Sequence, residues 1–215
     1  MVESGKRVFM GTISKAQILK MVQMAILIAI MLILAFTPLG YLKFGLIEIT
    51  LMVIPVAVGA IVLGPLCGAI LGGVFGITSF IQCFGFSAFG AFVLGINPWL
   101  TFITCLVPRI LCGWLSGLIF QALKKIDKTK IVSYVVASLS TALLNTIFFV
   151  GCVVLFFWNN DSFLQGMAES GMPLDSLWAF LVAFVGLNGL VEAIVNFIVG
   201  AGIAKVVDRY VHKVK

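Results

Sequence analysis

Long apolar runs, separated by short polar or glycine- and proline-containing stretches, make up most of this chain. A helix needs about twenty mainly apolar residues to cross the hydrocarbon core of a bilayer. On that rule the sequence predicts six transmembrane helices. They are expected at about 17–37, 47–63, 66–83, 99–124, 131–157 and 177–205.

The breaks between the runs predict how these helices are joined. Thr37-Pro38-Leu39-Gly40 ends the first helix, and Gly64-Pro65 leaves so little chain that the second and third helices must form a hairpin. The segment 84–96 is either a loop or a re-entrant segment. The longest polar stretch, 159–176, is either a lid or a solvated connector, and the sequence does not decide between them.

Composition supports a bilayer-embedded protein. The chain has 62% hydrophobic and 10% charged residues, with a mean hydropathy of +1.21. Soluble domains are near half apolar and a quarter charged. The predicted fold class is therefore an all-α integral membrane protein with one six-helix domain at 17–207. A cytoplasmic N-terminal segment at 1–16 would precede it, and a basic cytoplasmic tail at 208–215 would follow it.

The basic residues set the expected orientation. The net charge is +6, and every Lys and Arg except Lys43 and Arg109 lies before or at the start of the first helix, at or after the end of the fourth and before the fifth, or at or after the end of the sixth. Cytoplasmic loops carry an excess of Lys and Arg, so both termini are predicted to be cytoplasmic. No basic face interleaved with aromatic residues is present, which argues against nucleic acid as a partner.

A few polar residues lie within the apolar runs. Asn188, Glu192 and Asn196 share one helix face at spacings of four, Asn145 lies in the fifth helix and Arg109 in the fourth. Ionisable residues at membrane depth rarely face lipid. They form either the polar part of a solute pocket or a structural clamp between Arg109 and Glu192. Aromatic residues that could line such a pocket are Phe84, Trp99 and Trp158.

Catalytic and cofactor motifs are missing from the sequence. It has no G-x-x-x-x-G-K-[ST] sequence for ATP, no CxxC pair among its five cysteines, and one histidine, His212, in the polar tail. Without a membrane histidine no serine has a base to activate it. We therefore expect neither an enzyme nor a protein with a metal or cofactor.

Small residues recur at spacings of four in three places. Gly64, Gly68, Gly72 and Gly76 form one series, and Gly113 and Gly117 a second, at a spacing that lets helices approach closely. Packing within the chain is the favoured explanation for both. In the first helix, by contrast, Ala25-xxx-Ala29 is as well explained by docking to a partner, because that helix lies at the edge of the chain.

Several of these segments together resemble a known family. Thr37-Pro38-Leu39-Gly40, Ile54-Pro55 with the glycines that follow it, NPWLTF, Pro108-Arg109-Ile110-Leu111 and NGLVEAIVN resemble the substrate-binding S components of energy-coupling factor (ECF) vitamin transporters. The resemblance covers about 16–205, and Ala25-xxx-Ala29 matches the A-x-x-x-A motif in the first helix of that family.

The resemblance implies a six-helix S component in a bacterial plasma membrane. Such a subunit captures a small vitamin from outside and docks on a shared transmembrane T subunit driven by two cytoplasmic ATPases. Ala25 and Ala29 would then contact the T subunit, and Thr37–Leu46 and Cys83–Asn97 would gate the pocket.

Two features of the sequence bear on which vitamin such a subunit would bind. The sequence EITLMV stands where riboflavin-type members carry an Asp-Phe-Ser-like stretch, and the overall pattern is closer to the pantothenate and folate groups. Arg109 suits a carboxylate, which favours pantothenate. Folate, riboflavin or another vitamin is the alternative, and a stand-alone secondary transporter or channel is the alternative of another class.

Overall fold

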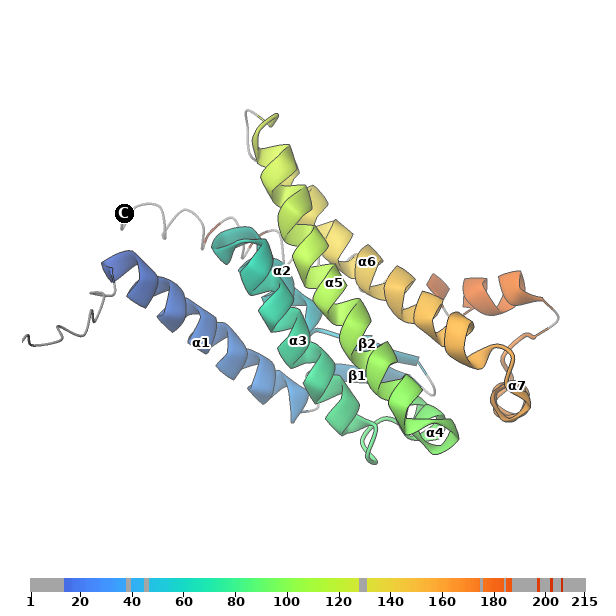
Figure 1. The fold of residues 1–215 in the computed structure, drawn as a ribbon. Helices are drawn as coiled ribbons and strands as arrows, with labels where there is room; N and C mark the ends of the chain where they lie inside the picture. The colour runs from blue at the N-terminus through green and yellow to red at the C-terminus, as the bar shows by residue number, and fades with distance from the viewer. Residues whose placement is uncertain are drawn as a thin grey trace, which may run out of the picture.

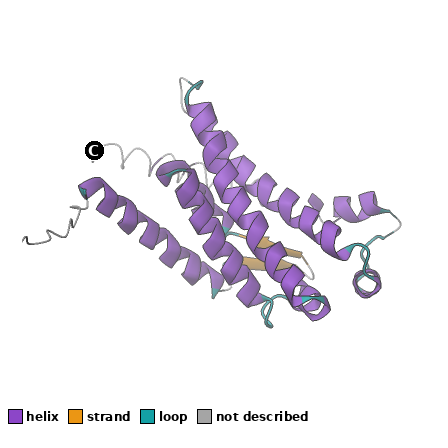
Figure 2. Ribbon diagram, viewed as in Figure 1, coloured by secondary structure: helices purple, strands orange, loops and turns teal. Residues whose placement is uncertain are grey.

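The computed structural model describes residues 14–37, 40–44, 47–127, 131–174, 176–183, 185–186, 197, 202 and 206. Helices dominate these residues, and two short strands form a hairpin (Figures 1 and 2). The helices are α1 (Lys15–Ala35), α2 (Val53–Leu63), α3 (Pro65–Gln82), α4 (Ala88–Ile96), α5 (Pro98–Lys124), α6 (Ile131–Phe157) and α7 (Asp161–Glu169). The strands are β1 (Tyr41–Phe44) and β2 (Ile47–Thr50).

The long helices pack side by side, with α5 at the centre of the group. Helix α3 lies against one side of α5 and α6 against another, while α2 contacts α3, α5 and α6. Helix α1 packs on α2 and α3 and lies at the edge of the bundle (Figure 1). Most of its apolar side chains are exposed, and only Met31 and Ala35 are buried.

Four helices are long and apolar enough to cross a membrane, judged by length and composition within the described residues. They are Lys15–Ala35, Pro65–Gln82, Pro98–Lys124 and Val132–Phe157. Helix α2 is also apolar but has only 11 residues. Residues 177–183 and 185–186 are helical, and most of the predicted sixth span lies outside the described residues.

Glycines bring α3 and α5 into backbone contact. A Cβ atom added at Gly68 would collide with the carbonyl oxygen of Gly113, and one at Gly72 with that of Arg109. In return, a Cβ at Gly113 would collide with the Gly68 carbonyl, and one at Gly117 with Pro65. Packing within the chain, the favoured explanation of both glycine series, is therefore confirmed for these positions.

The predicted second helix was wrong over its first residues. Residues 47–50 form β2, which pairs antiparallel with β1 in the register Tyr41↔Thr50 to Phe44↔Ile47, and the helix begins only at Val53. The β-branched Ile47 and Ile49 alternate with Glu48 and Thr50, which is the two-residue period of a strand. The apolar count of the run concealed that alternation.

Two polar or glycine-rich connections contain helices. The segment 84–96, left open between a loop and a re-entrant segment, forms α4, and Ser87 Oγ accepts a hydrogen bond from Gly90 N at 2.9 Å as its N-cap. The stretch 159–176 contains α7, capped by Asn160, whose side chain accepts from Phe163 N at 3.1 Å. Asn is among the preferred N-cap residues, and the acidic Asp161 that follows is favourable in the first turn of a helix.

One end of the bundle carries these extra elements, and we call it the α4 end. Helices α1, α3 and α6 end here and α5 begins here. Gln82 Nε2 at the end of α3 donates to the carbonyl oxygen of Ala35 at the end of α1. An aromatic cluster joins α4, α6 and α7. Its members include Phe89, Phe92, Phe157, Phe163 and Phe180.

Candidate functional site

Arg109 lies near the middle of α5, and its side chain is only 7% exposed. Its guanidinium carbon is 4.4 Å from the ring centroid of Phe149 in α6 and 5.4 Å from that of Phe75 in α3. Both distances are within the range of cation–π attraction. The charged group is therefore held between the three helices of the bundle centre and does not face lipid.

A proline fixes the direction of the Arg109 side chain. Pro108 has no backbone N–H, so the helical bond that residue 108 would donate to the Thr104 carbonyl cannot form. Arg109 Nη1 donates to that carbonyl oxygen instead, at 2.7 Å. Because Thr104 precedes Arg109 by five residues, the guanidinium is turned toward the α4 end of the bundle.

The charge of Arg109 is not neutralised within the described residues. No described carboxylate forms an ion pair with it, and its buried Nε atom has no hydrogen-bond partner there. An uncompensated buried charge costs several kcal/mol. The arrangement therefore calls for an anionic partner. Glu192, the candidate clamp partner, lies outside the described residues, as do Asn188 and Asn196.

Helix α6 supplies the polar wall opposite Arg109. Thr141, Asn145 and Phe149 share one face at spacings of four. Cys112 Sγ of α5 donates to the Thr141 carbonyl at 3.4 Å, and Phe149 lies beside the Arg109 guanidinium. Asn145, which is 5% exposed, lies between these two contacts, so the structure brings the predicted residues Arg109 and Asn145 to the same interface.

The three predicted aromatic residues lie elsewhere, toward the α4 end. Phe84 and Trp99 are 65% and 79% exposed, and Phe84 packs edge-on against Phe80. Trp158 is half-buried and packs against Phe180, with ring centroids 5.3 Å apart. None of these three rings is in cation–π range of Arg109.

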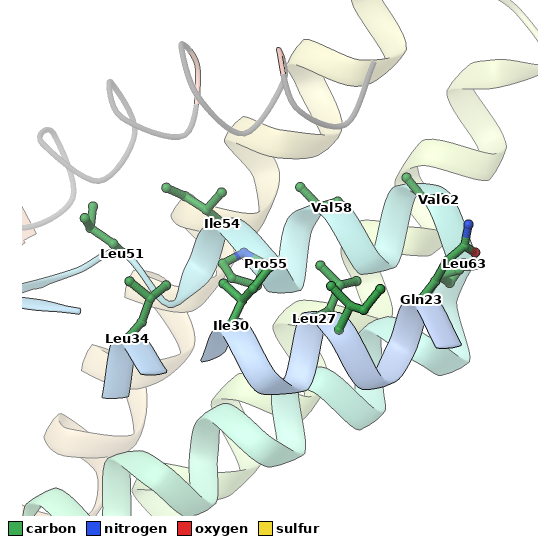
Figure 3. Close-up of a pocket in the computed structure, with 11 residues that line it drawn as sticks. Gln23, Leu27, Ile30, Leu34, Leu51, Ile54, Pro55, Val58, Val62 and Leu63 are labelled. Atoms are coloured by element: carbon green, nitrogen blue, oxygen red, sulfur yellow. The ribbon is translucent and has the colours of Figure 1, made fainter. Parts of the chain in front are cut away.

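A large groove between α1 and α2 has a different chemistry. It encloses about 450 Å³, and among the described residues that line it Gln23 is the only polar one. Figure 3 shows apolar side chains of the two helices facing each other across it: Leu27, Ile30 and Leu34 from α1 and Ile54, Pro55 and Val58 from α2. A polar solute would find almost no hydrogen-bonding groups here, so the interface around Arg109 is the better candidate site.

The predicted docking residues are accessible. Ala25 and Ala29 are both exposed on α1, and large exposed side chains such as Met21, Val22 and Ile33 surround them. The pair therefore forms a shallow strip on an apolar helix face that no other described element covers.

Comparison with known proteins identifies the family. The family model described as "ECF transporter, substrate-specific component" matches residues 19–204. The chain belongs to this family. Together with the four apolar spans, membership makes it a multi-pass membrane protein and a transporter component.

Two curated relatives carry more specific names. A "Pantothenate transporter PanT" of Leuconostoc mesenteroides subsp. mesenteroides is 29% identical over 188 residues, which cover 83% of this chain and 86% of the relative. A "Pantothenic acid transporter PanT" of Lactococcus lactis subsp. cremoris is 31% identical over 171 residues, which cover 74% of this chain and 78% of the relative. The resemblance seen in the sequence is thereby confirmed at the level of the family.

Sequence reasoning overlooked three residues of the S component's candidate site. Phe75 and Phe149 were indistinguishable from many other membrane phenylalanines. Thr104 did leave a signal, because a proline four residues later frees its carbonyl, and a long cationic side chain follows that proline directly.

Proposed function

We propose that this S component captures pantothenate and that Arg109 binds the vitamin's carboxylate. The observation that carries the proposal is the buried guanidinium with no anionic partner among the described residues and a free Nε–H. A guanidinium binds a carboxylate through two parallel N–H groups in its plane. Nη1 donates to the Thr104 carbonyl and two rings lie beside the group, which leaves the Nε–H as the donor for a carboxylate.

The names of the two relatives support this choice of vitamin. Pantothenate is an anion with a single carboxylate, an amide and two hydroxyls, so Asn145 and the polar stripe Asn188, Glu192 and Asn196 are proposed to bind its amide and hydroxyls. Phe84, Trp99 and Trp158 are proposed to line the path by which it enters.

The proposed topology has six spans with both termini in the cytoplasm, as the Lys and Arg clusters indicate. The α4 end then faces outward, and Arg109 is turned toward it. In this arrangement Thr37–Leu46 and Cys83–Asn97 are proposed to gate the pocket. The hydrogen bond from Gln82 to the Ala35 carbonyl joins the ends of α3 and α1, close to where the two segments begin.

Binding of purified protein to a panel of vitamins tests the proposal. We expect tight, ATP-independent binding of pantothenate, with folate and riboflavin failing to compete. The variant Arg109→Ala should lose at least about 2 kcal/mol of binding free energy, or about thirtyfold in affinity. Pantothenate affinity equal to wild type in this variant would return Arg109 to a structural role.

The clamp hypothesis makes a different prediction for the same variants. If Glu192 only neutralises Arg109, then Glu192→Gln and Arg109→Ala should both lower the thermal unfolding temperature while the surviving folded protein binds normally. If both residues contact the vitamin, each variant should lose pantothenate affinity while its thermal unfolding temperature stays close to that of wild type.

Energy is proposed to come from two cytoplasmic ATPases, through a T subunit that docks on the Ala25 and Ala29 face of α1. The variants Ala25→Trp and Ala29→Trp should block complex assembly and uptake but leave pantothenate binding intact. Ile26→Trp is the matched control, because it places the same bulk about 100° around the helix. Complexes that assemble normally with both alanine variants would exclude this face. Pantothenate uptake by vesicles containing this chain alone would instead indicate a stand-alone transporter.

A further inference from the structure

Buried hydroxyls on the helices of this protein usually bond to their own backbone. A Ser or Thr inside a helix commonly donates to the carbonyl four residues earlier, which satisfies the hydroxyl without any outside partner. Buried residues whose hydroxyl does so here are Thr78, Thr101, Ser116, Thr141 and Thr146.

Thr104 departs from this behaviour. Its side chain is 2% exposed, and its Oγ1 has no hydrogen-bond partner within the described residues. Leaving a buried hydroxyl unpaired is unfavourable, and the usual remedy of bonding to the preceding turn is not taken. The position therefore holds a polar atom that is ready for a partner from outside the helix.

The second unsatisfied atom belongs to a residue that contacts Thr104. The Thr104 carbonyl accepts from Arg109 Nη1 at 2.7 Å, and the buried Nε of Arg109 also lacks a partner among the described residues. Two residues of α5 that touch through the Thr104 carbonyl thus each keep one unpaired donor within the described part of the chain. A carboxylate has about four acceptor positions on its two oxygens and can use both donors at once.

We propose that Thr104 is a ligand-contacting residue, and that its hydroxyl donates to the same carboxylate that Arg109 binds. The proposal rests on the proposed function and adds a specificity-determining residue to it. Pro108 completes the arrangement as a positioning residue, because it frees the Thr104 carbonyl that holds the guanidinium against this residue.

The test compares Thr104→Val, which keeps the shape and removes the hydroxyl, with Thr104→Ser, which restores it. Thr146→Val is the matched control, since Thr146 is also a buried helical threonine and its hydroxyl donates to Ala142 O. Each purified protein is titrated with pantothenate and with pantothenol, in which an alcohol replaces the carboxylate.

Because the lost hydrogen bond is to a charged group, Thr104→Val should lose pantothenate affinity by at least about tenfold. We expect Thr104→Ser and Thr146→Val to stay within about threefold of wild type, and Thr104→Val to bind pantothenol as wild type does. Unchanged pantothenate affinity in Thr104→Val overturns the inference, and so does an equal loss for both ligands. If the wild-type protein binds no pantothenate at all, the proposed function itself fails, before any variant is considered.

Discussion

The two sides of α5 make different kinds of contact with the neighbouring helices. Toward α3 the contact is backbone against backbone, with Gly68 and Gly72 lying against Gly113 and Arg109, and no side chain fits between the helices. Toward α6 the contact includes the charged side chain of Arg109, the amide of Asn145 and Thr141. The first side is complete within the described chain, whereas the second retains unpaired polar atoms. From this difference we infer that α3 fixes the position of α5, and that the opposite side of α5 is the side left for the proposed solute site.

The largest effect on stability is expected on the side of α5 that faces α3. Gly72→Ala places a Cβ against the carbonyl oxygen of Arg109, which is a backbone atom and cannot move aside. We expect a loss of several kcal/mol in unfolding free energy, or failure to fold, since overpacking costs about 1–3 kcal/mol even in adaptable cores. Thermal unfolding in detergent measures it.

The neighbouring glycine is the control for this effect. A Cβ at Gly73 would meet only Ile110 Cγ1, at 3.8 Å. Gly73→Ala should therefore be neutral or stabilising by up to about 1 kcal/mol, because Ala is the better helix former. If both variants unfold at the same temperature, the close approach of α3 and α5 is not what holds α5 in place.

An intermediate effect is expected from a substitution of Pro108, which should change pantothenate affinity without lowering stability. In Pro108→Ala the new N–H competes with Arg109 for the Thr104 carbonyl, so the guanidinium loses its fixed direction. We expect pantothenate affinity to fall about tenfold while the unfolding temperature holds or rises, because proline inside a helix is itself unfavourable. A parallel fall of both quantities would mean that Pro108 only shapes the helix.

The smallest effect is expected from the ring beside Arg109. Phe149→Leu removes the aromatic face that lies 4.4 Å from the guanidinium carbon. The Phe75 ring remains beside the guanidinium, so we expect a loss of about 0.5–1 kcal/mol of cation–π attraction, or about twofold to fivefold in pantothenate affinity. Phe148→Leu, the adjacent phenylalanine, is the control and should bind normally; equal losses in the two variants would assign the effect to packing.

The two sides of α5 also differ in how far the sequence predicted them. Glycine spacing alone indicated the α3 side, and apolar length placed α1, α3, α5 and α6 within a few residues. Period-two alternation at 47–50 was masked by its apolar content, so the β hairpin was missed. On the α6 side Arg109 and Asn145 stood out because polar residues are rare in apolar runs. The Thr104 hydroxyl did not, since a threonine inside a helix normally satisfies itself.

The most direct test of the central claim is a cycle of two ligands and two proteins. Pantothenate and pantothenol are titrated into wild-type protein and into Arg109→Ala, and the acid-over-alcohol preference is compared. If Arg109 binds the carboxylate, the wild-type preference should be at least about thirtyfold and should fall close to one in the variant. A preference of the same size in both proteins would contradict the account.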